Sequence, residues 1–350
     1  MPPLLRRLLP IIGALALLLV LSFVLPERLT SVAFRIVMLS GIAIIMAVSL
    51  NLINGFTGQF SIGHAGFQAV GAYGAAALTV YGHRALFSYL PANGELPEGM
   101  AGFWRGAPAM ILALLAGGLL AALVGWVVGL PSLRLRGDYL AIVTLGFGEI
   151  IRVIVENTDA LGGPRGFQGA NNVDIPALSS FFWVYGMALL VIVVSRNLRF
   201  SVQGLQFLSV REDEVAAQSM GVDTTRVKVR AFVLGAFFAG AAGALYAHYD
   251  RSLSPTSFDF IRSFDIVTMV VLGGLGSITG AVVSAVLLTA LPEVLRSSLG
   301  SGLEQYRLVA YALLLIILMI VRPQGIFGRG ELRRDAFFRR RPPATPITPS

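Results

Sequence analysis

The stretch APAMILALLAGGLLAALVGWVVGL, residues Ala107 to Leu130, contains no charged side chain. As a helix it would be about 36 Å long, enough to cross a hydrocarbon core of roughly 30 Å. A transmembrane β-strand would alternate in polarity instead, so the pattern predicts an all-α, polytopic helical bundle. Four other windows are similarly apolar: Leu8 to Leu25, Phe181 to Ser195, Ala231 to Tyr249 and Leu308 to Val321.

Composition and charge agree with a membrane protein. Only 13% of the residues are charged, against about 25% in a soluble domain. The net charge of +8 comes mainly from arginines, and 17 of the 27 basic residues fall in four clusters. If these clusters face the cytoplasm, they give the positive-inside bias of a bacterial inner-membrane protein whose two termini are cytoplasmic. The charge therefore requires no nucleic acid as a partner.

The order of apolar and polar segments predicts about eight to ten crossings. Two glycine-rich breaks interrupt them, NGFTGQFSIGHAG at Asn54 to Gly66 and GGLGSITG at Gly273 to Gly280. The surrounding segment, Phe264 to Leu291, is too long for one crossing and too short for two. It therefore either dips into the membrane and returns or forms two short crossings. Broken helices in two halves of a chain are typical of a transport pathway. Both breaks contain a Ser-Ile pair, Ser61-Ile62 and Ser277-Ile278, but this similarity is too short to establish an internal repeat.

A polar island, Arg196 to Arg230, separates the apolar halves. Its run REDEVAAQSMGVDTTRVKV, from Arg211 to Val229, predicts a short amphipathic helix at the cytoplasmic face. Ser209 or Asp213 could cap the start of this helix, and Gly221 has the character of a C-terminal cap. Two interpretations remain open from the residues alone: a solvated helix without a partner, or a helix that docks onto one.

The single lysine excludes one source of energy. A P-loop requires the pattern GxxxxGK[ST], and Lys228, the only lysine, does not stand in it. The chain is therefore not expected to be an enzyme, and any ATP must be bound and hydrolysed by another subunit. We expect no cofactor and no metal in this chain, which has no cysteine.

Six motifs, in this order, resemble the permease subunits of the branched-chain (hydrophobic) amino acid ABC importer family, in its LivM-like branch. They are SLNLINGFTGQFSIGHAGF (Ser49 to Phe67), LRGDYLAIVTLGFGEIIR (Leu135 to Arg152), REDEVAAQSMGVDTTRVK (Arg211 to Lys228), AGAAGALYA (Ala239 to Ala247), VLGGLGSITGAV (Val271 to Val282) and VRPQGIFG (Val321 to Gly328). One departure is GLQFLSVR, Gly204 to Arg211, where the family usually has Gly-Arg-Ala and Ala-Ile-Arg.

The resemblance implies a transmembrane permease domain over residues 1–328, with a coupling loop at about 196–230. A basic, disordered cytoplasmic tail over 329–350 would lie near anionic membrane lipid. The implied partners are a homologous second permease, two ABC ATPase subunits and a periplasmic substrate-binding protein. The residues expected to couple the permease to the ATPase are Arg211, Glu212, Glu214, Ala216, Ala217 and Gly221.

Polar groups at membrane depth cost free energy unless they are paired, so they are candidates for the translocation path. Alternatively, the asparagines and serines cap half-helices. For His64 a packing hydrogen bond competes with a role in proton transfer, and for Glu149 an ion pair with Arg152 competes with gating. The candidates are Asn51, Asn54, Gln59, Ser61, His64, Gln68, Glu149, Gly273, Gly276 and Ser277.

Other functions remain as alternatives at this point. Related permeases carry urea, short amides or other amino acids on a similar scaffold. A secondary, ion-coupled transporter would need ionisable residues in its spans, of which the chain has few, and would not need a docking helix. A membrane scaffold that recruits a cytosolic enzyme would have no reason to break its helices.

Overall fold

The computed structural model describes residues 3–97, 99–132, 137–299 and 325–328, together with positions 313, 316, 320 and 321. The basic link at 133–136, most of the predicted span Leu308 to Val321 and the tail 329–350 lie outside these residues. The α-helices are α1 (Pro3–Arg28), α2 (Ser31–Asn51), α3 (His64–Tyr81), α4 (His83–Leu86), α5 (Met100–Ser132), α6 (Asp138–Glu156), α7 (Phe181–Arg199), α8 (Val202–Glu212), α9 (Glu214–Ser219), α10 (Thr224–Asp250), α11 (Phe260–Gly273) and α12 (Ile278–Leu299).

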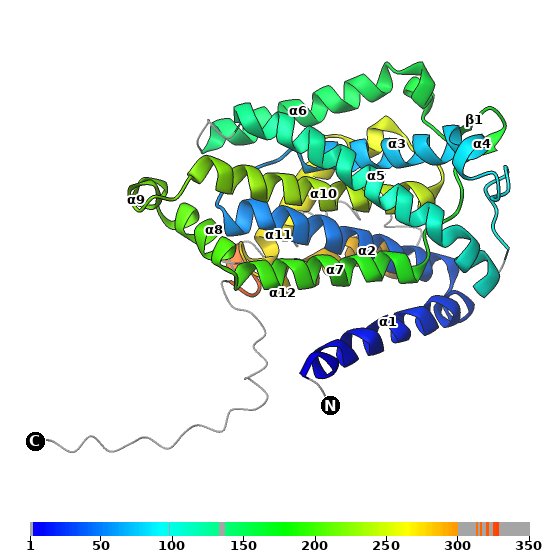
Figure 1. Cartoon of the computed structure of the whole chain (residues 1–350), viewed down its shortest axis with the longest axis horizontal. Helices are drawn as coiled ribbons and strands as arrows, with labels where there is room; N and C mark the ends of the chain where they lie inside the picture. Colours follow the sequence, from blue (N-terminus) through cyan, green and yellow to red (C-terminus); the bar gives the residue numbers. More distant parts are fainter. Residues whose placement is uncertain are drawn as a thin grey trace, which may run out of the picture.

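The fold is the predicted all-α bundle of a multi-pass membrane protein (Figure 1). Among the described residues, four helices are long and apolar enough to cross a membrane. They cover Ser31–Phe56, Met100–Leu130, Phe181–Arg199 and Thr224–Asp250. Several other apolar helices pack around these four, and the number of crossings stays a prediction.

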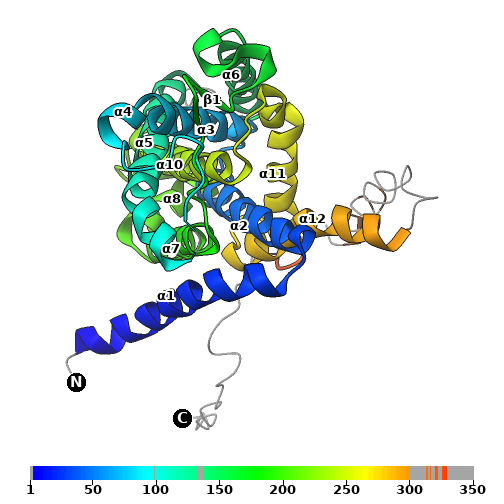
Figure 2. The same ribbon diagram turned by 90° about the vertical axis from the view of Figure 1, so that its right-hand side faces the viewer.

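The bundle is built around α2 and α10. From Ser40 to Asn51 every residue of α2 is buried, and α10 packs on both α3 and α5. Figures 1 and 2 show α2 and α10 in the middle of the bundle, with α1 reaching away from it beside α7. At the crossing of α3, α5 and α10 the backbones meet at Gly71, Gly117 and Gly240. A Cβ on Gly71 would lie 2.1 Å from the Gly240 carbonyl oxygen, so this close packing requires residues without side chains.

The loop between α6 and α7 contains a short antiparallel hairpin. Its two strands, β1 (Gly169–Ala170) and β2 (Val173–Asp174), are joined by Asn171 and Asn172, which both have positive φ. Two consecutive left-handed residues give the twist that a two-residue hairpin turn needs, and asparagine tolerates this conformation. Three 3-10 turns complete the loops, at Asp159–Leu161, at Gly163–Arg165 and, between α10 and α11, at Pro255–Phe258.

The ambiguous segment Phe264 to Leu291 forms two helices that fold back on each other. They cross closely at Gly273 and Gly280, whose backbones are in contact. One turn further from the bend, Ser284 on α12 donates a hydrogen bond to the Met269 carbonyl of α11. With 14 residues, α11 is about 21 Å long and too short to cross a hydrocarbon core alone. The glycine-rich break is thus the bend of a helical hairpin.

Candidate functional site

The first break begins where α2 widens into a π-helix at Leu52–Phe56. A π-helical turn leaves backbone groups without their regular partners and is frequent at functional sites. Here Thr57 Oγ1 donates to the Ile53 carbonyl at 2.8 Å. The buried Asn54 amide bridges the loop that follows, since its Nδ2 donates to Ser61 O and its Oδ1 accepts from Ser61 N. Asn54 therefore holds the irregular backbone together.

The second break lies directly against the first. Asn51 Oδ1 accepts from the Gly276 amide at 2.8 Å, and Asn51 Nδ2 donates to the Ser277 carbonyl at 3.2 Å. A Cβ on Gly55 would stand 2.5 Å from the Gly276 nitrogen. The two segments therefore contact each other through their main chains. Residues more than 220 positions apart thus form one junction between the two breaks.

Two arginines attach the polar island to this junction. Arg211 Nη1, from the last turn of α8, donates to the Gly55 carbonyl at 2.7 Å. Arg199 Nη1, from the end of α7, donates to the Gly276 carbonyl at 3.1 Å, and its guanidinium lies 6.0 Å from the Phe56 ring centroid. Carbonyls at a helix end lack intrahelical partners, and Arg211 satisfies one of them. A guanidinium from the polar island thus binds a main-chain oxygen in each break.

The short helix predicted within Arg211 to Val229 is α9, and of its two predicted caps Asp213 is the one that starts it. The run covers the end of α8, all of α9 and the start of α10. Asp213 interrupts it, because its backbone is extended (φ −156°, ψ 111°) and its Oδ1 accepts from the amides of Val215 and Ala216. Ser209 is not the cap, since its hydroxyl donates to the Gln206 carbonyl.

The predicted end of the helix at Gly221 is confirmed. Gly221 has φ +83°, the left-handed conformation that commonly ends a helix. Its amide donates to the Gln218 carbonyl at 2.9 Å, and the next amide, that of Val222, donates to Ala217 at 3.0 Å. The chain then turns directly into α10, where Asp223 caps the Arg226 amide.

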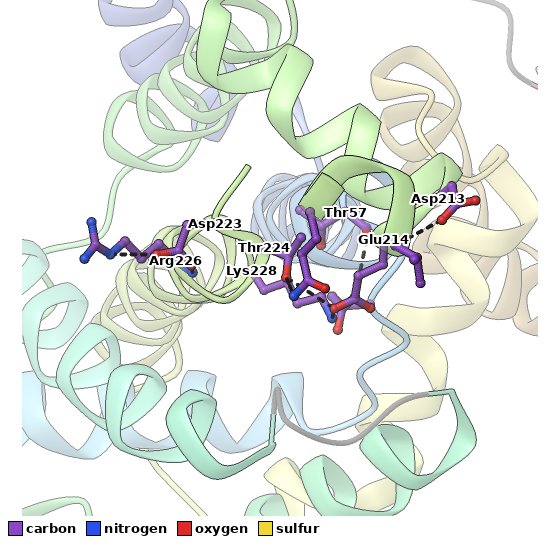
Figure 3. Close-up of polar contacts among 10 residues, drawn as sticks. Thr57, Asp213, Glu214, Asp223, Thr224, Arg226 and Lys228 are labelled. Atoms are coloured by element: carbon purple, nitrogen blue, oxygen red, sulfur yellow. Dashed lines mark hydrogen bonds and ion pairs between the residues drawn. The ribbon is translucent and has the colours of Figure 1, made fainter. Parts of the chain in front are cut away.

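Glu214 is held inside the chain (Figure 3). Its Oε1 accepts from Lys228 Nζ at 2.7 Å and lies 3.4 Å from the Thr224 hydroxyl. The Lys228 side chain is only 2% exposed, and that of Glu214 is 23% exposed. Glu214, one of the expected coupling residues, is thus paired with Lys228 of the same chain, and the pair joins α9 to α10.

The exposed side of α9 and of its C-cap Met220 carries apolar residues beside the polar Gln218 and Ser219. Val215 and Met220 are 61% and 84% exposed, and Ala216 between them is exposed as well. Ala217 points the other way and is buried in the bundle, while Glu212, at the end of α8, is exposed. Of the coupling candidates, Ala216 and Glu212 lie at the surface, and Arg211, Glu214 and Ala217 make contacts within the chain.

The departure from the family pattern at Gly204 to Arg211 lies in α8. Phe207 and Val210 are buried and belong to the core. Gly204 approaches the Leu198 carbonyl so closely that a Cβ would lie 1.9 Å from its oxygen. Residues of this segment therefore pack α8 on the bundle.

Three buried polar atoms near the first break have no hydrogen-bond partner among the described residues. They are Ser61 Oγ, His64 Nδ1 and Gln68 Oε1. The other ring nitrogen of His64, Nε2, lies 2.8 Å from Ser49 Oγ, in agreement with a packing role. His64 and Gln68 are one turn apart on the same face of α3. Buried polar atoms without a partner call for an explanation, and these three form a series beside the break.

Two further candidates for the translocation path, Gln59 and Glu149, lie in different parts of the bundle. Gln59 is half-buried in the loop after the π-helix and contacts the Thr57 carbonyl. Glu149 forms the predicted ion pair with Arg152 at 2.8 Å, and Arg152 also binds Glu156 at 2.8 Å. This trio lies along α6, outside the junction of the two breaks. Arg199 was not predicted as a site residue, and its only sequence signal is its position at the start of the polar island.

Together, the fold and this junction define a multi-pass α-helical membrane protein of the permease class, with broken spans joined to a polar loop. The family of the branched-chain amino acid transport system permease component matches residues 32–318. The chain belongs to this family.

Three relatives illustrate the match. The high-affinity branched-chain amino acid transport system permease protein LivM of Escherichia coli is 35% identical over 343 residues, 89% of this chain and 74% of that protein. The corresponding permease protein LivH of the same organism is 30% identical over 186 residues, 48% of this chain and 59% of LivH. A probable LivM permease of Methanocaldococcus jannaschii is 27% identical over 240 residues, 63% of this chain and 69% of that protein. No solved structure matches the chain with significance.

Proposed function

We propose that this permease carries branched-chain amino acids across the bacterial inner membrane as one subunit of an ATP-driven importer. The observation that carries the proposal is family membership over residues 32–318. Relatives of two kinds, LivM and LivH, are both named as permease proteins of a branched-chain amino acid transport system. This supports a second, homologous permease as the partner subunit within the membrane.

The energy would come from two ATPase subunits that bind on the cytoplasmic side. The exposed apolar side chains of Val215, Ala216 and Met220, on α9 and at its end, suit a protein partner. Movement of this surface would reach the membrane breaks through Arg211 and Arg199, which bind Gly55 and Gly276. ATP would be bound only by the partner subunits, and a periplasmic binding protein would deliver the substrate and select it.

Uptake of labelled leucine tests the proposal. Cells with this permease, its neighbouring ATPase genes and the binding-protein gene should accumulate leucine, and deletion of the ATPase genes should abolish uptake. Uptake that persists without the ATPase would indicate an ion-coupled transporter. Uptake of labelled urea in place of leucine would assign the permease to a different cargo.

The docking surface has its own test. Met220→Glu should reduce copurification of the ATPase subunits, because a carboxylate replaces an exposed apolar anchor on α9. Ser252→Glu, at an exposed position just beyond the far end of α10, serves as the control. Normal copurification with Met220→Glu would show that α9 is not the contact.

A further inference from the structure

A small cavity lies at the end of the bundle away from α9. Its volume is about 170 Å³. It lies between the first turns of α2 and the last turns of α10, and α10 is about 40 Å long, so the ATPase-facing loop is far away. The residues that shape it are Arg35, Leu39, Gln68, Tyr246, Phe258 and Arg262.

Two arginine residues, Arg35 and Arg262, line the cavity. Arg35 is engaged by Asp250, with 3.4 Å between Arg35 Nη2 and Asp250 Oδ1. Arg262 is half-buried and, among the described residues, has no carboxylate oxygen within 4.0 Å of its guanidinium. Asp259 caps the Arg262 backbone amide, and Asp265 lies near enough for its charge to interact with Arg262. The Arg262 guanidinium is thus the group available for an anion.

Gln68 supplies a second polar contact. Its side chain is 1% exposed, and its Oε1 has no hydrogen-bond partner among the described residues. A glutamine amide offers an acceptor and two donors, so it can accept from an ammonium group. Tyr246, which lines the cavity together with Ser257, adds a third polar group.

The remaining wall is apolar. Phe258 is 2% exposed and packs edge-on against the Tyr246 ring, with 5.8 Å between ring centroids. Leu39 of α2 lies across from them in the same cavity. Leu39 and Phe258 are the apolar members of a lining that is otherwise polar, so the cavity offers polar and apolar contacts to a small molecule.

We propose that this cavity binds the zwitterion of an aliphatic α-amino acid during transport, an inference that rests on the proposed function. Arg262 binds the carboxylate, Gln68 Oε1 accepts from the ammonium group, and Leu39 and Phe258 contact the aliphatic side chain. The series of unpartnered polar atoms from Gln68 to His64 then leads from this site toward the first break.

Cysteine labelling tests the site directly, because the chain has no cysteine of its own. Ser257→Cys and Leu39→Cys each place one thiol at the cavity, and Thr256→Cys places a control thiol on the exposed side of the same turn. The full-length protein in lipid nanodiscs is labelled with a methanethiosulfonate reagent. Leucine at ten times its dissociation constant should slow labelling of the cavity thiols about tenfold and leave the control unchanged.

Ligand analogues and variants identify the groups that bind. Leucinamide lacks the carboxylate and 4-methylpentanoate lacks the ammonium group, so each should protect far less than leucine. Arg262→Ala should abolish protection and Arg262→Lys should keep part of it. Equal protection by inorganic phosphate, or protection that follows the content of acidic lipid, would overturn the proposal in favour of a phosphate or headgroup site. Absence of labelling at both cavity thiols, or no protection by leucine, would also overturn it.

Leucine uptake by the complete transporter is measured in parallel. Uptake without protection contradicts the cavity site and leaves the proposed function standing. Protection without uptake supports the cavity and contradicts the proposed cargo.

Discussion

Removal of the Glu214 carboxylate should destabilise the protein far more than removal of its partner. The Lys228 side chain is 2% exposed, so Glu214→Gln leaves a buried ammonium without its counter-charge. Breaking a buried pair in this way costs about 3–5 kcal/mol. Because Glu214 is 23% exposed, some water reaches the pair and we expect a cost of about 3 kcal/mol, at the lower end of that range.

The reverse substitution should be milder. In Lys228→Met the ammonium is gone, and the partly exposed Glu214 carboxylate can turn to water, so a cost of about 1 kcal/mol is expected. The double variant Glu214→Gln/Lys228→Met should lie closer to the wild type than Glu214→Gln alone. This non-additivity is what a double-mutant cycle measures between residues in contact.

The measurement is the free energy of unfolding of the purified protein in mixed micelles, by titration with a denaturing detergent. Arg226→Ala is the control, because it breaks an exposed ion pair with Asp223, where the side chains are 77% and 52% exposed. That pair should contribute at most about 1 kcal/mol. If Glu214→Gln costs no more than Arg226→Ala, the Lys228–Glu214 pair does not hold α9 on α10.

Three further results are expected. Arg211→Ala removes a hydrogen bond from a charged donor, worth about 1.5–3 kcal/mol. The number of leucine molecules transported per ATP in proteoliposomes should therefore fall, and Arg211→Lys should restore part of it. An unchanged ratio would argue that Arg211 does not transmit movement from α9 to the breaks. Gly71→Ala should lower the thermal unfolding temperature, since its Cβ would lie 2.1 Å from the Gly240 carbonyl oxygen. Gly186→Ala, whose Cβ would have no atom within 4 Å, should not lower it. Equal effects of the two variants would contradict the close crossing of α3 and α10. Gly221→Ala places a side chain at φ +83°, at a cost of about 1–2 kcal/mol. It should weaken ATP-driven uptake but leave the protein in the membrane. Uptake assays and membrane fractionation of the same cells measure these two results.

Local signals in the sequence predicted much of the fold. Uninterrupted apolar windows such as Ala107 to Leu130 correspond to long helices, because a helix satisfies its own backbone in lipid. The glycine-rich breaks and the end of α9 at Gly221 were also visible, since each depends on residues that are neighbours in the chain.

Contacts between distant residues were not visible. The sequence could not show that Asn51 binds Gly276, or that Lys228 and not a partner's cation neutralises Glu214. The sequence also left open which of the two predicted caps, Ser209 or Asp213, starts α9. Arg262 gave no signal at all, because its importance comes from the cavity that five separate segments form around it.

The junction of the two breaks has a consequence for reading related sequences. Arg199 and Arg211 bind main-chain oxygens, which every amino acid carries. At the acceptor positions, Gly55 and Gly276, there is therefore no side chain whose substitution could correlate with a substitution of either arginine. A search for co-varying residue pairs would therefore not detect the hydrogen bonds from Arg211 to Gly55 and from Arg199 to Gly276. The sequence feature expected at the acceptor positions is glycine, because Gly55 and Gly276 have no room for a side chain.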